Sequence, residues 1–405
     1  MAKLKPFKAW RPKPELAPDV ACVPYDVINT QEAKKLASGN PRSFLHVIRP
    51  EIDLLANTSV YDPKVYEKGR ENLISLLNSD AFLHEENESF YIYQLTMNGR
   101  NQAGIFGCVS VQDYENDTIL KHELTRPDKE DDRTKHIITQ EAHAEPVMIT
   151  FRDTKTDSIT DFMDGFMENN NPIYDFTSED GVTHSIWKVD RIDTLEGAFN
   201  NIPNLYIADG HHRCASASRA AKEYASHNPT HTGEEEYNFF PAVLFPMDQM
   251  EILAYNRIIF SVPDDFISRL HEKFTLKKNT KPVPSEKGMI SLYINDNWYG
   301  LTLKQTTQKD PASQLDISLL QHQILEPMLG IKDQRTDPNI DFVGGIRGTE
   351  ELEKLVDNDE AALGISMYPT AIEELLEVSD AGLLMPPKST WFEPKLRSGL
   401  LVHTF

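Results

Sequence analysis

Five consecutive residues with functional potential, Asp209-Gly210-His211-His212-Arg213, stand between an apolar run and an alanine-rich segment. Where a strand ends in Asp-Gly and leads directly into a helix, the first N–H groups of the helix lack intrahelical partners, and the helix dipole attracts an anion to them. Gly210 permits a backbone geometry that most residues resist, and it leaves room for a ligand. We therefore expect a phosphate-binding turn here.

The side chains of this turn match the chemistry of a phosphate site. Arg213 carries a planar donor fork that suits phosphate oxygens. Asp209 stands where a carboxylate could bind Mg²⁺, which usually takes one or two protein carboxylates together with phosphate. The alternative is that Asp209 merely caps the helix and that the two histidines are incidental. The unbroken run of five such residues favours a site.

Two further motifs carry residues suited to phosphoryl transfer. Glu123, which follows His122, could act as general base for a substrate hydroxyl, although an ordinary solvated face is the alternative. Near the C-terminus, Lys388, Ser389 and Thr390 follow two prolines. This stiff segment offers an ammonium group and two hydroxyls to a phosphate, and its alternative is a surface loop.

The segment IADGHHRCASA resembles the signature loop of the ParB/sulfiredoxin-like fold, in the form carried by archaeal free L-serine kinases. The resemblance implies that the loop holds the phosphates of a nucleotide. It also implies a catalytic role for Glu123 and a phosphate-binding role for Lys388, because these kinases carry a similar His-Glu pair and a similar Pro-Lys-Thr-Thr element. Glu123 and Asp209 are further apart than the kinase pattern implies, so we expect an insertion around residues 125–185.

Segments spread over nearly the full length resemble the bacterial domain of unknown function 1015 family. They are VPYDVIN (residues 23–29), NPRSFLHVIRPE (40–51), KHELTRPDKEDDR (121–133), ADGHHR (208–213) and MPPKSTWFEPKLRSGL (385–400). This resemblance is specific but implies little about chemistry. The functional expectation therefore comes through the serine kinases.

Composition narrows the possible partners. The net charge of −22 argues against general nucleic-acid binding, because most of the surface would repel a polyphosphate backbone. The three cysteines are far apart and form no CxxC spacing, which argues against a disulfide framework and a thiolate zinc site. With neither a signal peptide nor a long apolar run in the sequence, we expect a cytoplasmic protein without a membrane partner.

The elements around the motifs follow from local patterns. A strand pattern at residues 205–208 precedes the turn, and helix-favouring residues 214–224 follow it. Helices are also expected at 31–38 and 63–77, and strands at 44–48, 90–95 and 104–112. These patterns predict a mixed α/β (α+β) fold with a boundary near residue 261. By resemblance, residues 1–260 form a ParB/sulfiredoxin-like nucleotide-binding core with insertions. Residues 261–405 form a smaller C-terminal α/β domain whose end, residues 385–399, returns to the active site.

The motifs together predict a small-molecule phosphotransferase of the kinase type in serine metabolism. Its substrate would be free L-serine or O-phosphoserine, its cofactor Mg²⁺ held by Asp209, and its phosphoryl donor or acceptor ATP or ADP, with pyrophosphate as another possible donor. The expected catalytic residues are Glu123, Asp209 and His211; the expected nucleotide or phosphate ligands are Gly210, His211, His212, Arg213, Lys388, Ser389 and Thr390.

Two other classes of function stay open. A metal-dependent hydrolase, such as a phosphatase, would use Asp209, His211, His212, His122 and Glu123 as metal ligands, although the sequence has no HExxH motif. A non-catalytic nucleotide-binding regulator would bind nucleotide without turnover. The sequence contains neither a Walker loop nor an HRD–DFG kinase set, which excludes the common kinase folds.

Overall fold

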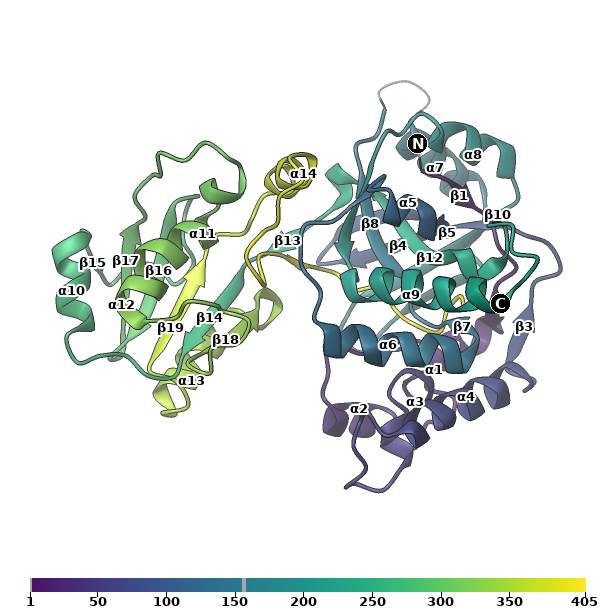
Figure 1. Ribbon diagram of the computed structural model, residues 1–405, viewed down its shortest axis with the longest axis horizontal. Helices are drawn as coiled ribbons and strands as arrows, with labels where there is room; N and C mark the ends of the chain where they lie inside the picture. The colour runs from purple at the N-terminus through teal and green to yellow at the C-terminus, as the bar shows by residue number, and fades with distance from the viewer. Residues whose placement is uncertain (1, 155–157) are drawn as a thin grey trace. The chain divides into compact units, whose positions relative to one another are not determined.

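The computed structural model describes residues 2–154 and 158–405, and the chain divides into two compact units (Figure 1). The larger unit comprises Met1–Lys121, Thr125–Met250 and Pro394–Phe405, and the smaller comprises His122–Leu124 and Glu251–Glu393. Each unit contains its own sheet and its own apolar core. None of the helices within the described ranges has both the length and the apolar character needed to cross a membrane.

A mixed sheet forms the centre of the larger unit, in the order β6-β11-β8-β12-β5-β4-β10-β9, with β1 also paired to β5. β11 is parallel to β6 and β12 is parallel to β8, whereas the other pairs are antiparallel. The strands are β1 (Leu4–Lys5), β4 (Phe90–Met97), β5 (Arg100–Ser110), β6 (Ile119–Leu120), β8 (Val147–Phe151), β9 (Tyr174–Thr177), β10 (Thr183–Val189), β11 (Leu205–Asp209) and β12 (Phe239–Pro246). This sheet, together with the helices around it, confirms the mixed α/β class.

Two long helices, α6 (Pro127–Gln140) and α9 (His211–His227), pack side by side in this unit (Figure 1). On α9, the small residues Cys214, Ala217 and Ala221 recur at helical spacing. All three belong to the apolar core that also contains the buried side chains of the sheet. The hydroxyl of Tyr224 also donates to the carbonyl of Ile138 on α6, 3.0 Å away. The alanine-rich composition thus lets α9 lie close to its neighbours.

The remaining elements of the larger unit are one further long helix and several short helices and strands. The helices are α1 (Ala17–Val20), α2 (Thr30–Leu36), α3 (Leu45–Ile48), α4 (Pro63–Leu77), α5 (Val111–Glu115), α7 (Ile159–Asn169) and α8 (Ile192–Phe199). Two strand pairs complete the unit: β2 (Trp10–Pro12) with β3 (Phe82–His84), and β7 (Ala142–His143) with β21 (His403–Thr404). The predicted helices near residues 31–38 and 63–77 are confirmed by α2 and α4.

One local prediction is wrong: residues 44–48 form no strand, and α3 occupies Leu45–Ile48 instead. Phe44, Leu45, Val47 and Ile48 are all buried in the same core cluster. A run of apolar residues this short suits a buried helical turn as well as a buried strand, so its pattern alone does not decide between them.

The smaller unit has a fully antiparallel sheet in the order β15-β17-β16-β19-β14-β18. Its strands are β14 (Tyr255–Ile259), β15 (Lys277–Lys278), β16 (Met289–Ile294), β17 (Asn297–Thr302), β18 (Ile340–Gly344) and β19 (Leu363–Met367); β13 (Ile252–Leu253) pairs with β20 (Trp391–Phe392). Its helices are α10 (Phe266–Lys273), α11 (Asp316–Leu320), α12 (Glu326–Leu329), α13 (Glu350–Asp357) and α14 (Ile372–Asp380), with a π-helical turn at Gln321–Leu325.

The chain crosses between the units earlier than the predicted boundary near residue 261. Apart from the short segment His122–Leu124, it leaves the larger unit after Met250, because β14 pairs with β18 and β19 and so belongs to the smaller sheet. It re-enters the larger unit at Pro394. There, backbone hydrogen bonds join Ser398 to Cys22 and Val402 to Trp10, which fixes the path of the C-terminal segment.

Candidate functional site

The turn between β11 and α9 has the geometry that an anion site needs. β11 ends at Asp209, and its pairing with β8 is irregular between Ile207 and Asp209. Gly210 is the N-cap of α9 and has a φ of 108°, a conformation that favours glycine. A Cβ at this position would lie 3.1 Å from Nε of Arg213. Any other residue would be strained by this backbone conformation and would also crowd the guanidinium.

Asp209 does not cap the helix, since the cap residue is Gly210 and no side chain makes a capping bond. Instead, Oδ2 of Asp209 lies 3.3 Å from Nζ of Lys395 and 3.5 Å from Nη2 of Arg213. Burial raises the pKa of Asp209, but the two cations outweigh it and hold that pKa well below the usual range. The carboxylate is ionised, and a quarter of its side chain is exposed.

Arg213 is turned into the protein. Its side chain is only 9% exposed, and its guanidinium donates to the carbonyl of Pro146 as well as to Asp209. Burial lowers the pKa of Arg213, but Asp209, Asp26 and Glu145 favour its charged form and keep that pKa above the ordinary value. These contacts support a role for Arg213 in positioning Asp209, and its predicted role as a phosphate ligand stays a prediction.

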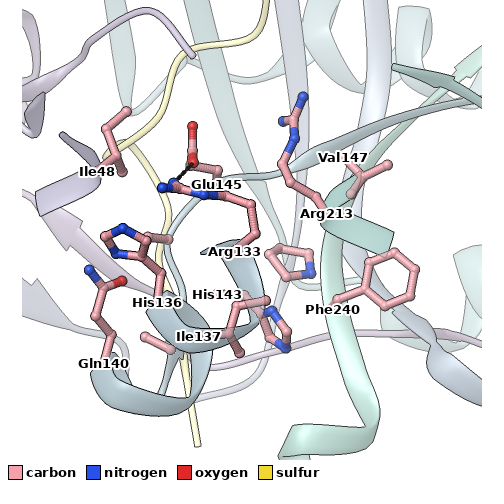
Figure 2. A pocket seen from close by; sticks show the side chains of 13 residues that line it. Ile48, Arg133, His136, Ile137, Gln140, His143, Glu145, Val147, Arg213 and Phe240 are labelled. Carbon is pink, nitrogen blue, oxygen red and sulfur yellow. Dashed lines mark ion pairs between the residues drawn. The ribbon is translucent and has the colours of Figure 1, made fainter. Parts of the chain in front are cut away.

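Two further buried charges, Arg133 and Glu145, lie near Arg213 and form the ion pair drawn in Figure 2. Arg133 on α6 lies 3.6 Å from Glu145 and 2.8 Å from Asp132. Burial raises the pKa of Glu145, and the guanidinium groups of Arg213 and Arg133 oppose that rise. Arg133, Glu145 and Arg213 line a small pocket of about 30 Å³. His136 and His143 line it too, and Nδ1 of His136 and Nε2 of His143 have no hydrogen-bond partner. A pocket of this size has room for a water molecule beside these histidines.

His212 connects the starts of two helices. The backbone N–H of Arg126, the N-cap of α6, donates to Nε2 of His212, 3.0 Å away. This bond assigns the acceptor role to Nε2 and brings the N-terminal end of α6 to that of α9. Helix N-termini favour a bound anion, and the acidic residues Asp128 and Glu130 in the first turn of α6 oppose that effect.

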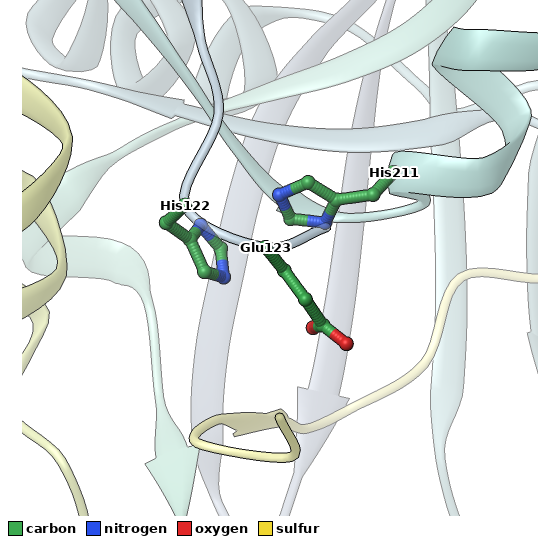
Figure 3. A group of neighbouring side chains, drawn as sticks. All are labelled: His122, Glu123 and His211. Atoms are coloured by element: carbon green, nitrogen blue, oxygen red, sulfur yellow. The ribbon is translucent and has the colours of Figure 1, made fainter. Parts of the chain in front are cut away.

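The loop that leaves β6 carries the predicted base. His122, Glu123 and His211 form a group of neighbouring side chains (Figure 3), and one ligand atom from each lies within 4.8 Å of the others. His122 and His211 are buried, whereas Glu123 is half-buried. Two imidazoles and a carboxylate suit a transition-metal ion, whereas the oxygen donor of Asp209 suits Mg²⁺.

Glu123 also lines an open pocket of about 300 Å³ in the smaller unit. Asp333 and Arg335 line the same pocket and pair with each other through two bonds of 3.0 Å. Between them, the buried Gln334 donates to Oε1 of Gln321, 2.8 Å away in the π-helical turn, and so anchors their loop. The pocket thus combines a guanidinium with two carboxylates.

The predicted segment of Lys388, Ser389 and Thr390 also belongs to the smaller unit. Lys388 is exposed, has a φ of 56°, and holds its ammonium 5.4 Å from the ring centre of Tyr255. Its carbonyl accepts from the buried Arg257, 3.0 Å away. The hydroxyl of Ser389 donates to Pro386 at 2.6 Å, so this hydroxyl is engaged within the loop. The phosphate-binding role of the segment stays a prediction.

Sequence reasoning missed Lys395. The residue lies in the motif MPPKSTWFEPKLRSGL, from which only residues 388–390 were predicted to bind phosphate. It is Lys395 whose ammonium contacts Asp209, and the two residues are 186 positions apart in the sequence. Its place as the second basic residue of this motif was the only sequence feature that indicated Lys395.

The fold and the site define a class: a mixed α/β protein with an ionised aspartate at a strand end that leads into a helix N-terminus. The chain belongs to the family described as "Protein of unknown function (DUF1015)", which it matches over residues 4–318. This confirms the family resemblance. None of the curated proteins matches the chain.

Several solved structures are similar at low identity. A free serine kinase in complex with AMP is 11% identical, with a TM-score of 0.39, over 73% of this chain and 92% of that one. A conserved hypothetical protein from Pyrococcus furiosus is 12% identical, with a TM-score of 0.36, over 73% and 95%. SbnI with a C-terminal truncation, from Staphylococcus aureus, is 13% identical, with a TM-score of 0.40, over 74% and 87%. These values are too low to transfer an activity.

Proposed function

We propose that the protein is a magnesium-dependent phosphotransferase that moves a phosphoryl group between a nucleotide and free L-serine or O-phosphoserine. The observation that carries the proposal is the ionised carboxylate of Asp209, set directly before the N-terminus of α9. A partly exposed carboxylate beside helix N–H groups supports the joint binding of Mg²⁺ and phosphate. A helix cap alone would not need two cations on that carboxylate.

The proposed roles follow from residue chemistry. Asp209 would hold the ion, and His211 and His212, with the backbone at Gly210, would contact nucleotide phosphates. Bound Mg²⁺ would offset charge on the phosphate oxygens. Lys388, Ser389 and Thr390 would bind phosphate in the same reaction.

In the forward direction, the serine hydroxyl oxygen forms a bond to phosphorus while the bond to the nucleotide oxygen breaks. Glu123 takes the hydroxyl proton, and the nucleotide leaves with one phosphate fewer. In the reverse direction, O-phosphoserine gives its phosphoryl group to a nucleoside diphosphate, and Glu123 returns the proton. Positioning and electrostatic stabilisation carry most of the catalysis in such transfers.

The pocket of the smaller unit supports an amino-acid substrate. Its volume of about 300 Å³ stands at the lower end of the range for ligand sites. Arg335 suits a substrate carboxylate, Asp333 suits an ammonium group, and Glu123 suits a hydroxyl. A small zwitterion with a hydroxyl group satisfies all three.

Phosphoryl transfer can be followed directly. The purified protein is incubated with Mg²⁺ and L-serine plus ATP, ADP or pyrophosphate, and in a parallel reaction with O-phosphoserine plus ADP, and ³¹P NMR records the products. We expect O-phosphoserine to form or to be consumed. If serine is neither phosphorylated nor dephosphorylated with any of these partners, the proposal is wrong.

A metal-dependent hydrolase is the second candidate, and the group of His122, Glu123 and His211 favours it. Such an enzyme would retain zinc, iron or manganese in stoichiometric amounts through purification and would release inorganic phosphate from phosphomonoesters. The phosphotransferase would require Mg²⁺ only together with nucleotide. Metal analysis of the purified protein separates the two.

A further inference from the structure

The contact between Lys395 and Asp209 joins two segments that the sequence keeps far apart. Nζ of Lys395 lies 3.3 Å from Oδ2 of Asp209, the same oxygen that Arg213 contacts at 3.5 Å. The Lys395 side chain is 12% exposed and the Asp209 side chain is 25% exposed. The carboxylate is therefore partly accessible from solvent, and the Lys395 side chain beside it is more deeply buried.

The two cations differ in how firmly they are held. Arg213 donates to the carbonyl of Pro146 and lies among Glu145 and other buried charges, so its guanidinium is fixed. Lys395 ends in a compact ammonium group on a flexible four-carbon stem, so the ammonium can change position without a change in the backbone. Of the two, Lys395 is the cation that a metal ion can displace.

The backbone that carries Lys395 is held in place. Ser398, three residues after Lys395, exchanges backbone hydrogen bonds of 2.9 and 3.2 Å with Cys22. Between them, the N–H of Arg397 donates to the hydroxyl of Tyr93, 3.3 Å away, and its guanidinium pairs with Asp180. Any exchange of partners at Lys395 therefore involves its side chain rather than the whole segment.

We propose that Lys395 has two successive roles: it neutralises Asp209 before nucleotide binds, and it becomes a phosphate ligand once a metal ion takes its place on Asp209. The inference rests on the proposed function, because it assumes that Asp209 receives the ion. An ammonium group on the carboxylate competes with a divalent cation, so the site keeps a low affinity for metal alone. When metal and nucleotide bind together, the displaced ammonium group of Lys395 contacts the phosphates.

The test uses full-length protein and two binding measurements that need no turnover. Mn²⁺ affinity without nucleotide is measured by electron paramagnetic resonance, and affinity for ATP with Mg²⁺ by calorimetry. We expect Lys395→Met to bind Mn²⁺ about tenfold more tightly than the wild type and to bind ATP with Mg²⁺ about tenfold more weakly. A tenfold change in affinity lies between the effects of losing an exposed ion pair and a buried one. A residue that only supported the fold would change both affinities in the same direction.

Two variants serve as controls. Lys395→Arg keeps the positive charge and should keep the weak affinity for Mn²⁺, and it shows whether the position tolerates substitution. Lys8→Met removes an exposed lysine of the same unit and should leave both affinities unchanged. The inference is overturned if Lys395→Met binds Mn²⁺ no more tightly than the wild type, or if it binds ATP equally well.

The outcomes also separate this inference from the proposed function. If the two affinities shift in opposite directions but no phosphoryl group reaches serine, the role of Lys395 is supported and the serine kinase activity is wrong. If transfer to serine proceeds but the opposite shifts are missing, the role of Lys395 is wrong and the activity is supported.

Discussion

The turn at residues 209–213 and the loop at residues 386–390 were both predicted to bind phosphate, yet they are built in different ways. In the turn, Asp209 is held by two cations, and Arg213 continues into a buried series of charges. In the loop, Lys388 is exposed and its backbone has a φ of 56°, held by a bond from Arg257. The turn depends on paired charges, whereas the loop depends on backbone geometry.

The two regions should therefore respond differently to substitution. Burial costs the charges in the turn their hydration, so each depends on its partner, and removing one leaves another buried and unpaired. In the loop, burial lowers the pKa of Arg257 to about 10. The hydrogen bonds that its guanidinium donates to backbone carbonyls offset the cost of its desolvation. The Lys388 side chain itself is not needed for that arrangement.

The largest expected effect follows from Asp209→Asn, which keeps the shape of the side chain and removes its charge. We expect transfer activity to fall about 10³-fold, since a preorganised charge at the reacting group is lost. Steady-state kinetics would measure the loss, and circular dichroism would check the fold. An activity within tenfold of the wild type would show that this carboxylate is not central.

Glu123→Gln tests the proposed base and separates an enzyme from a regulator. We expect the rate of transfer to fall about 10²-fold, within the range for removal of a general base, while ADP affinity stays within about twofold. Single-turnover kinetics and calorimetry provide the two numbers. Should the wild type bind nucleotide and show no turnover at all, the non-catalytic regulator would be the better description.

Arg335→Gln tests the pocket of the smaller unit. We expect KM for L-serine to rise about tenfold with kcat within about twofold, because the lost contact binds substrate and transition state alike. Lys332→Gln, at an exposed position outside the pocket lining, is the matched control. An unchanged KM in Arg335→Gln would mean that the substrate carboxylate binds elsewhere.

The smallest effect concerns stability. Lys388→Gly and Lys388→Ala both remove the ammonium group, but only glycine adopts a φ of 56° without strain. We expect the glycine variant to be more stable than the alanine variant by about 1 kcal/mol in urea unfolding. Equal stability of the two would indicate that the loop relaxes when the lysine is removed.

Local patterns predicted much of the fold and part of the site. The strand-turn-helix at residues 205–227 and the helix at Pro63–Leu77 were predictable because periodicity, capping and glycine act within a few residues. The helical turn at Leu45–Ile48 was not, since only tertiary burial decides the state of so short an apolar run.

Contacts between residues far apart in the sequence could not be predicted from local patterns. Lys395 lies 186 residues from Asp209, and Glu145 lies 120 residues from Tyr25, whose N–H it accepts at 3.1 Å. The fold creates these pairs by returning the C-terminal segment to the larger unit and by packing the N-terminal segment against it. Sequence motifs indicate that such residues matter, but the partner of each residue follows only from the topology.

The most direct test of the central claim is a crystal structure of the protein with ADP and Mg²⁺. We expect the phosphates to lie within hydrogen-bond distance of the backbone N–H groups at the start of α9, with the ion on the carboxylate of Asp209. Phosphates bound elsewhere on the protein, with Asp209 still paired to Lys395, would contradict it.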